Sequence, residues 1–327
     1  MPTSAFAIRR RLPVLALAAT ALFASGAVMA QGASGPIRIV VGASAGGTTD
    51  TLARSIAKLM EVDLKRPVIV ENKPGAGGNI AAEHVARSTP DGDTLLMSFT
   101  SHTINPSIYK KMPFDTVKDF TPITMVAKVP SVLVASAKVP VGSVQELIDY
   151  AKKNPGKLNF AIGGTGSSLH MAGEQFKMHT GVEIVNVAYK GTTPAMTDVL
   201  AGHAELMFAS TLNVLPHVGS GKIKVLGVTS AKPMPQFPGV PPIGATVPGF
   251  ESNAWFGLFG PAKMPAATTD RLYQAASKAV QDPGFQKRLE TDGGSPALMK
   301  PAEFSDFIVQ DIQRWAKVVK FSGATVE

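Results

Sequence analysis

The 327-residue chain contains no cysteine. This absence excludes a disulfide scaffold, thiolate metal sites, iron–sulfur clusters and cysteine catalysis. It also excludes an N-terminal lipoprotein anchor, which is attached to a cysteine at the cleavage site. Aromatic residues make up only 7% and charged residues 17%, but hydrophobic residues reach 45%. The composition is therefore that of a globular chain, long enough for about two domains.

The chain also lacks the charge pattern of a nucleic-acid-binding protein. Its formal net charge is +8, and no block of five like charges occurs. We therefore expect no nucleic-acid partner. There is no P-loop and no H-E-x-x-H motif, and the six histidines show no metal-ligand spacing. We expect no metal and no cofactor.

The N-terminus has the pattern of an export signal. Three arginines at 9–11 precede an almost wholly apolar stretch at 12–28, and Val28-Met29-Ala30 is a small-x-small cleavage site. The apolar stretch is shorter than the ~20 residues that a membrane span needs. We therefore expect residues 1–30 to be a signal peptide cleaved before Gln31, rather than an anchor, and the remaining chain to reach the periplasm.

Strand and helix patterns alternate along the rest of the chain. A β-rich stretch at 37–41 leads through a glycine-rich segment, 42–47, into an amphipathic helix, and the same order recurs at 158–172. This alternation predicts an α/β fold with largely parallel sheets, and we expect the strand region 126–135 to be broken at Pro130. The repeated unit suggests two similar domains, each with a helix N-terminus directed at a cleft.

Both glycine-rich segments have the features of an anion site. Free N–H groups at a helix N-terminus, with about half a positive charge from the helix dipole, bind a carboxylate or phosphate without lysine or arginine. Segment 42–50 contains no basic residue, and 163–170 contains only His170. Recognition would fall to backbone amides and to the hydroxyls of Ser44, Thr48, Thr49, Thr165, Ser167 and Ser168. The alternative is that the glycines serve only tight turns and close packing; two matched segments favour the anion site.

One catalytic motif is present in an unusual place, and one cofactor motif is present only in part. Residues 42–46 match the G-x-S-x-G elbow of hydrolases, with Ser44 as the nucleophile. In hydrolases several strands precede that elbow, whereas here it follows the first strand, so we expect no enzyme. Residues 164–169 lack the third glycine of a dinucleotide fingerprint. Trp255 and Trp315 are interpreted as core residues.

Nine short segments occur in a fixed order along the chain. They are AGGTTD (45–50), NKPGAGGN (72–79), TPDG (89–92), INPS (104–107), VKDFTP (117–122), GTGSS (164–168), YKG (189–191), WFGLF (255–259) and RW (314–315). As an ordered set they resemble the periplasmic solute receptors of the tripartite tricarboxylate transporters, often called Bug receptors. The resemblance covers the whole chain after the signal segment.

This resemblance implies a type II-like periplasmic binding protein, a Venus flytrap of two α/β domains with a ligand cleft between them. Domain 1 would comprise residues 31–130 and the C-terminal return 252–327, and domain 2 residues 131–251. The implied function is to capture a small organic acid, a di- or tricarboxylate or an aromatic carboxylate, and deliver it to a membrane permease of the tripartite tricarboxylate type. We expect a monomer. The alternatives are a sensor that presents the carboxylate to a two-component kinase and, more remotely, a secreted serine esterase using Ser44.

The resemblance and the anion-site argument together place ligand contacts in both glycine-rich segments and near them. The expected ligand-binding residues are Ala43, Ser44, Gly46, Gly47, Thr48, Thr49, Asp50, Thr100, Ser101, Gly164, Thr165, Gly166, Ser167, Ser168, His170, Tyr189, Lys190 and Ser210. Family members usually carry Pro-Phe where this chain has Gly42-Ala43, and losing a phenylalanine predicts a larger or differently shaped pocket. They often carry an aspartate where Ala209-Ser210 stands, so its absence favours plain acids over amino acids.

Overall fold

The computed structural model describes residues 35–326, so the expected signal segment lies outside the described residues. The strands are β1 Ile37–Val41, β2 Val68–Asn72, β3 Thr94–Phe99, β4 Phe120–Ser136, β5 Asn159–Ile162, β6 Val185–Ala188, β7 Leu206–Ser210, β8 Ile223–Val228, β9 Asn253–Pro261 and β10 Ser295–Pro296. The α-helices are α1 Thr48–Leu64, α2 Asn79–Ala86, α3 Ser101–Ile108, α4 Val144–Lys153, α5 Ser168–Thr180, α6 Thr192–Ala201, α7 Thr211–Val214, α8 Ala266–Gln281, α9 Pro283–Thr291 and α10 Pro301–Ser322. Over the described residues, we find no helix that is both long and apolar enough to span a bilayer.

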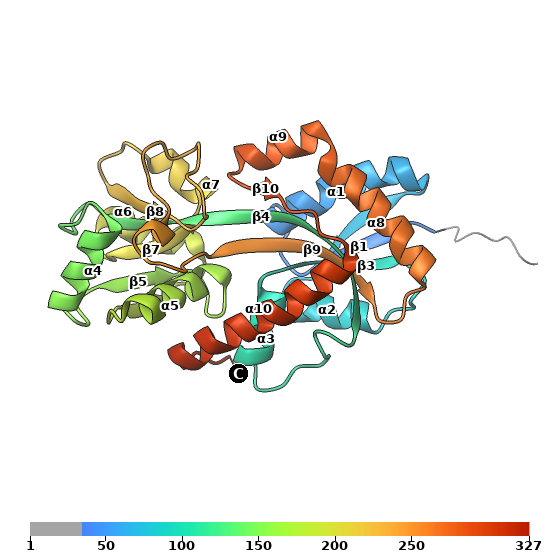
Figure 1. The fold of residues 1–327 in the computed structure, drawn as a ribbon, viewed down its shortest axis with the longest axis horizontal. Helices are drawn as coiled ribbons and strands as arrows, with labels where there is room; N and C mark the ends of the chain where they lie inside the picture. Colours follow the sequence, from blue (N-terminus) through green and yellow to red (C-terminus); the bar gives the residue numbers. More distant parts are fainter. Residues whose placement is uncertain (1–34, 327) are drawn as a thin grey trace, which may run out of the picture. The chain divides into compact units, whose positions relative to one another are not determined.

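The strands form a mixed sheet in the order β2-β1-β3-β9-β4-β7-β5-β6, with β8 and β10 also paired to β4. We call β1, β2, β3, β9 and β10 with their helices the terminal lobe, and β5 to β8 with theirs the central lobe; β4 runs through both (Figure 1). The α/β prediction is confirmed, but the sheet is not largely parallel. The reason is that β4 and β9, which lie where the lobes join, run antiparallel to their neighbours.

Strand β4 is continuous through Pro130, so the expected break at this proline is wrong. Up to Pro130 the strand pairs with β9, and from Ser131 onward it pairs with β7. A proline has no N–H to donate to a sheet. Here it stands where the strand changes partner, so the missing donor interrupts neither ladder. The domain borders given above stay a prediction.

Helices cover both faces of the sheet in the terminal lobe. Consecutive strand residues point to opposite faces. Ile39 of β1 is buried in one core with Ile56 of α1 and residues of α8, while its neighbour Val40 is buried in a second core with α2 and Phe304 of α10. The apolar run Ile39-Val40-Val41 at the end of β1 follows from this two-sided burial.

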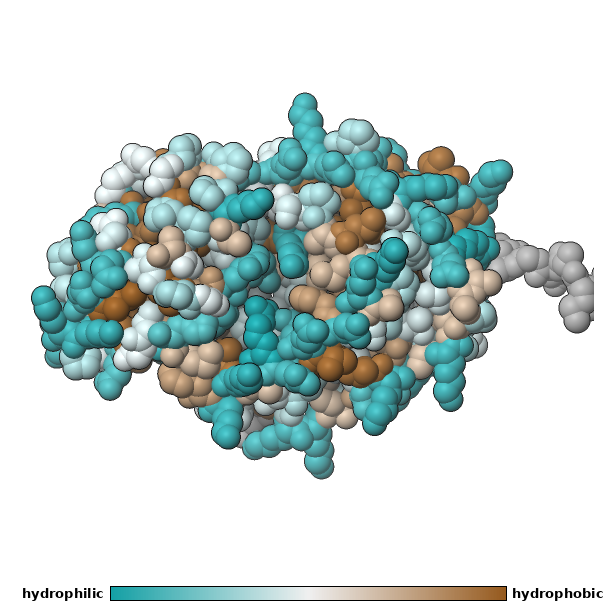
Figure 2. Space-filling model, in the orientation of Figure 1, coloured by the Kyte–Doolittle hydropathy of each residue, from teal (hydrophilic) through white to brown (hydrophobic). Residues whose placement is uncertain are grey.

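The central lobe is layered in the same way. Leu133 of β4 packs in one core with Leu147 of α4 and Phe176 of α5, whereas the adjacent Val132 packs in another with Val199 of α6. The face of the molecule shown in Figure 2 is mostly hydrophilic, with apolar residues in small separate areas.

Helix α10 packs against elements of both lobes. Its first turns bury Phe304 in the terminal lobe. Its last turns bury Trp315 and Val318 in a cluster that also contains Ile108 of α3 and Met171 of α5. Figure 1 shows this helix running beneath the sheet from one lobe towards the other. The two lobes are thus joined by β4 and β9 and also touched by one long helix.

Candidate ligand-binding site

A cavity of about 160 Å³ lies where residues of the two lobes meet. Its lining residues are Thr48, Val129, Pro130, Ser131, Ser168, Leu169, Ser210, Ser252, Ala254 and Phe256. Thr48 is the first residue of α1, Ser168 is the first residue of α5, and Ser210 is the last residue of β7. Three residues expected at the site, far apart in the sequence, are therefore brought together. No side chain in this lining carries a charge.

The N-terminus of α1 has amide groups to offer at this cavity. Its N-cap is Gly47, which has no side chain, so no side chain caps the helix. The N–H groups of Thr48 and Thr49, in the first turn, have no acceptor within the helix. Helix α5 differs in that the N-cap Ser167 accepts a hydrogen bond from the N–H of His170, at 3.2 Å. Both helices direct the positive end of their dipole to this region.

Asp50 belongs to the support of the first glycine segment. Its Oδ2 accepts the N–H of Gly46 at 2.9 Å and the Nε of Arg54 at 3.0 Å, and its Oδ1 accepts the side-chain amide of Asn72 at 2.9 Å. The same amide also donates to the carbonyl of Ala43, at 3.0 Å. Burial by itself raises the pKa of Asp50, but the hydrogen bonds, led by that of Arg54, outweigh burial and keep the pKa below its usual value.

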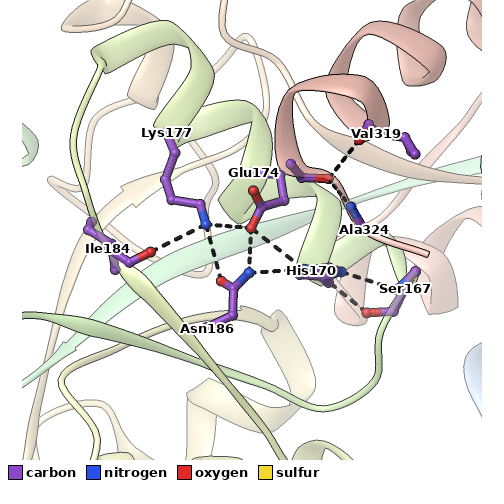
Figure 3. Close-up of polar contacts among 10 residues, drawn as sticks. Ser167, His170, Glu174, Lys177, Ile184, Asn186, Val319 and Ala324 are labelled. Atoms are coloured by element: carbon purple, nitrogen blue, oxygen red, sulfur yellow. Dashed lines mark hydrogen bonds and ion pairs between the residues drawn. The ribbon is translucent and has the colours of Figure 1, made fainter. Parts of the chain in front are cut away.

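The side chain of His170 also contacts other residues of the protein rather than the cavity. Its side chain is buried, and its Nδ1 accepts the N–H of Gly166 at 3.1 Å. Figure 3 shows the ring beside Glu174 and Asn186, within a group of polar side chains between α5 and β6. His170 is not one of the residues that line the cavity.

Four other expected residues also lie outside the cavity lining. Thr100 is buried, and its hydroxyl accepts the backbone N–H of Trp255 at 2.9 Å. Ser101 is buried in the first turn of α3. The hydroxyl of Tyr189 donates to Asp198 at 2.8 Å; burial, with this hydrogen bond, raises the pKa of Tyr189. Lys190 is exposed.

The remaining expected residues flank Thr48 and Ser168 without lining the cavity themselves. They are Ala43, Ser44, Gly46, Gly47, Thr49, Gly164, Thr165, Gly166 and Ser167. Ala43 packs against the core of the terminal lobe. The larger or differently shaped pocket expected from the missing phenylalanine stays a prediction. Gly42 has a packing reason: a Cβ at this position would come within 2.7 Å of the Cα of Gly78.

Sequence reasoning missed the part of the cavity formed by β4 and β9. Ser252, Ala254 and Phe256 alternate along the chain, as do Val129 and Ser131, and these residues line the cavity. Period-two alternation is the signal that puts each set on one face of a strand. The sequence does not show which of the two faces meets a ligand, because that depends on the pairing of β4 with β9.

The structure offers no partner to Ser44 as a nucleophile. Ser44 is exposed, and within residues 35–326 no hydrogen bond joins its hydroxyl to a histidine. A serine nucleophile is normally activated by such a base. In the same residues, no group of three histidine, aspartate or glutamate side chains is placed to hold a metal ion.

Comparison with known proteins identifies the fold class. The chain is similar to R. palustris Rpa4515, solved with adipate, at 33% identity over 90% of this chain and 99% of that one, with a TM-score of 0.78. It is similar to MatC of Rhodopseudomonas palustris, solved with bound malate, at 30% identity over 87% and 98% of the two chains, with a TM-score of 0.73. The fold is thus the two-domain α/β architecture of the periplasmic binding proteins.

The sequence comparisons establish the family. The family model described as the tripartite tricarboxylate transporter family receptor matches residues 52–323. The protein BugT of Bordetella pertussis is 33% identical over 89% of this chain and 90% of its own. The chain therefore belongs to the family of tripartite tricarboxylate transporter receptors, a family of solute receptors rather than enzymes. The resemblance inferred from the nine sequence segments is confirmed.

Proposed function

We propose that this protein is an extracytoplasmic receptor that binds a small dicarboxylate in the 160 Å³ cavity and delivers it to a tripartite tricarboxylate permease. The observation that carries the proposal is the convergence of two helix N-termini, at Thr48 and Ser168, on a cavity lined by hydroxyls and without charged side chains. The free amides and the dipole of each helix favour a negative group, typically by 0.3–1 kcal/mol from the dipole.

The geometry favours two carboxylates in one ligand. The two helices come from different lobes, so each can hold one end of a molecule that bridges them. The cavity is smaller than the roughly 300–1,000 Å³ of ordinary ligand pockets, which favours a short acid. Adipate and malate, found with the two related structures, are both short dicarboxylates.

Binding of this kind provides a mechanism for signalling occupancy to a membrane partner. A ligand that contacts both lobes binds the closed arrangement best, so it shifts the population of the receptor towards that arrangement. The permease would then recognise the closed form. The export pattern in residues 1–30 and the family membership support a periplasmic location.

A thermal-shift screen of the chain from residue 31 onward tests the proposal. The panel contains C4 to C6 dicarboxylates, citrate, aromatic carboxylates, monocarboxylates and amino acids, followed by calorimetry on the strongest compound. A ligand at 100 times its Kd adds about 2.7 kcal/mol to the stability. We expect short dicarboxylates to raise the melting temperature by several degrees. A screen in which no carboxylate shifts the transition contradicts the proposal.

Hydroxyl deletions locate the binding site. Thr48→Val and Ser168→Ala should each weaken the best dicarboxylate about tenfold, since each loses a hydrogen bond to a charged group, worth about 1.5–3 kcal/mol. Ser55→Ala is the control: it lies on α1, its hydroxyl donates to the carbonyl of Thr51, and it does not line the cavity. Equal affinity in all three variants would place the ligand elsewhere.

A further inference from the structure

The second glycine segment, residues 163–167, depends on one left-handed glycine. Gly166 has φ +79°, a conformation that other residues rarely adopt. It directly precedes the N-cap Ser167 and the cavity residue Ser168. Whatever fixes the peptide of Gly166 therefore also fixes the direction of the first amides of α5.

That peptide is fixed by His170. The N–H of Gly166 donates to Nδ1 of the ring at 3.1 Å, and the histidine is only 3% exposed. Because Nδ1 accepts, the proton of the neutral ring is on Nε2. On that side lie Oε1 of Glu174, at 3.5 Å, and the side-chain amide of Asn186, at 3.2 Å. The carboxylate favours this tautomer, and the Asn186 amide then donates to Glu174 rather than to the ring.

Glu174 is itself held in place by two further side chains. Its Oε1 accepts the side-chain amide of Asn186 at 2.6 Å and the ammonium group of Lys177 at 2.6 Å (Figure 3). Glu174 is 1% exposed. Burial raises its pKa, but the hydrogen bonds from His170, Lys177 and Asn186 together outweigh burial and keep that pKa below the usual value. A charged carboxylate thus stands behind the ring.

We propose that His170 is a positioning residue for ligand binding, held by Glu174 and acting through the N–H of Gly166. It does not touch the ligand; it keeps the second glycine segment in the shape that presents Ser168 and the first amides of α5 to the cavity. The inference rests on the proposed function, since it assigns how that same site is held in shape. It also means that the N–H of Gly166 is already used and is not offered to the ligand.

Two substitutions of His170 separate positioning from mere stability. In His170→Asn, the side-chain oxygen lies close to the former Nδ1 and can still accept from Gly166. In His170→Gln, the terminal amide reaches the former Nε2 and leaves Gly166 without its acceptor. Both remove the ring. We expect similar melting temperatures, a dicarboxylate Kd about tenfold higher for His170→Gln, and a Kd within about threefold of the unchanged protein for His170→Asn.

A second readout needs no ligand. Amide hydrogen exchange at Gly166 should be slow in the unchanged protein and in His170→Asn, and should accelerate about tenfold in His170→Gln. Glu174→Ala removes the acceptor of the Nε2 proton, and we expect it to accelerate exchange at Gly166 as well. The control is His179→Gln, an exposed histidine on the same helix, which should change neither exchange at Gly166 nor Kd.

The outcomes are distinct. Slow exchange at Gly166 in His170→Gln would overturn the proposal, and so would equal losses of affinity in the asparagine and glutamine variants. If the unchanged protein binds no carboxylate, the proposed function fails, whereas exchange at Gly166 still decides whether His170 positions the segment. Accelerated exchange in His170→Gln and Glu174→Ala, but not in His170→Asn or His179→Gln, together with a selective rise in Kd for His170→Gln, supports it.

Discussion

Asp50 and His170 occupy the same position in their two helices, and each accepts the N–H of a left-handed glycine four residues earlier. Gly46 has φ +83° and bonds to Asp50; Gly166 has φ +79° and bonds to His170. In both cases the acceptor is the third residue of the helix. The two glycine segments are therefore built alike, although one anchor is a carboxylate and the other an imidazole.

The resemblance extends to what holds each anchor. Asp50 is contacted by Arg54, four residues further along α1, and by Asn72 of the following strand. His170 is contacted by Glu174, four residues further along α5, and by Asn186 of the following strand. Both anchors thus have one partner on the next helical turn and an asparagine on the next strand.

Removing the first anchor should affect both stability and binding. Asp50→Ala leaves Arg54, Asn72 and the N–H of Gly46 without their common acceptor, so we expect the free energy of unfolding to fall by about 1–3 kcal/mol. Dicarboxylate affinity should fall as well, since the segment before Thr48 loses its support. Urea unfolding and calorimetry measure the two effects. Asp270→Ala, an exposed aspartate on α8, is the control, and similar behaviour of the two variants would refute the role given to Asp50.

Asp311 should be among the most costly side chains to remove. Its Oδ2 accepts from the hydroxyl of Thr103 at 2.6 Å and from the indole N–H groups of Trp255 and Trp315 at 2.9 and 3.1 Å. Asp311→Ala leaves both buried indole N–H groups unpaired and removes the ion-pair partner of Arg314, 2.7 Å away, so we expect a loss of about 3–5 kcal/mol. Chemical unfolding followed by tryptophan fluorescence measures it. A loss below about 1 kcal/mol would show that the network relaxes or admits water.

Acid should destabilise the protein through His102. This ring lies among phenylalanines, 4.9 Å from Phe120 and 5.0 Å from Phe259 between ring centroids, and its Nε2 is buried without a partner. Burial lowers the pKa of His102 from 6.5 to about 3. At a pH between about 3 and 6.5, His102 of the unfolded chain binds a proton that His102 of the folded chain does not. The stabilisation is complete above pH 6.5 and declines, by up to about 1.4 kcal/mol per pH unit, as the pH falls.

The variant His102→Phe tests this dependence. Phenylalanine suits an aromatic surrounding and cannot take up a proton. The carboxylates contribute equally to both proteins, so the difference in unfolding free energy between pH 6.5 and 4.5 isolates the histidine. We expect a flatter profile for the variant. Parallel profiles would mean that His102 is protonated as readily in the folded as in the unfolded chain.

Alanine substitutions at two adjacent glycines should have very different effects on stability. A Cβ on Gly163 would come within 2.8 Å of the backbone nitrogen of Thr192, at the start of α6, whereas a Cβ on Gly164 meets nothing within 4 Å. Gly163→Ala should cost about 1–3 kcal/mol, because the backbone has to shift. Gly164→Ala should change stability by less than about 0.5 kcal/mol. Thermal unfolding of the pair checks this, and equal costs would disprove the close approach.

Much of the site could be predicted from the sequence because its signals are local. A glycine-rich segment followed by a helix start is visible in one stretch of chain, and Thr48 and Ser168 do line the cavity. The directions of Asp50 and His170 could not be predicted, since a polar residue in the first turn suits a ligand as well as the neighbouring peptide. The role of Asp311 could not be predicted from the sequence either. Asp311 is buried because Thr103, 208 residues earlier in the sequence, lies beside it.

The fold shows the same division between local and distant causes. The helix that begins at Thr48 follows from a short-range pattern and is confirmed. The passage of β4 through Pro130 was not predicted, because it depends on a change of partner from β9 to β7, two strands far away in the sequence.

The last prediction concerns a second cavity beside β4 and β9, lined by residues that alternate with those of the ligand cavity. Ser252 and Ala254 line the ligand cavity, whereas Glu251 and Asn253, which alternate with them, line a second cavity of about 750 Å³. There the side-chain amide of Gln236, from the central lobe, donates to the carbonyl of Glu290 in the terminal lobe. Because alternate residues of these strands line the two cavities, we expect a rotation about the strands that narrows one cavity to widen the other. The contact of Gln236 should therefore oppose closure around a ligand.

Gln236→Ala should accordingly bind the best dicarboxylate more tightly, by about two- to fivefold, because losing the contact raises the population of the closed form. The free energy of unfolding should fall slightly, by about 1 kcal/mol. Calorimetry and small-angle scattering with and without ligand provide the measurements. Gln281→Ala is the control, since its amide donates to Ser277 within α8 and spans no lobes. If Gln236→Ala weakens binding, the contact belongs to the closed arrangement, and the rotation has the opposite sense.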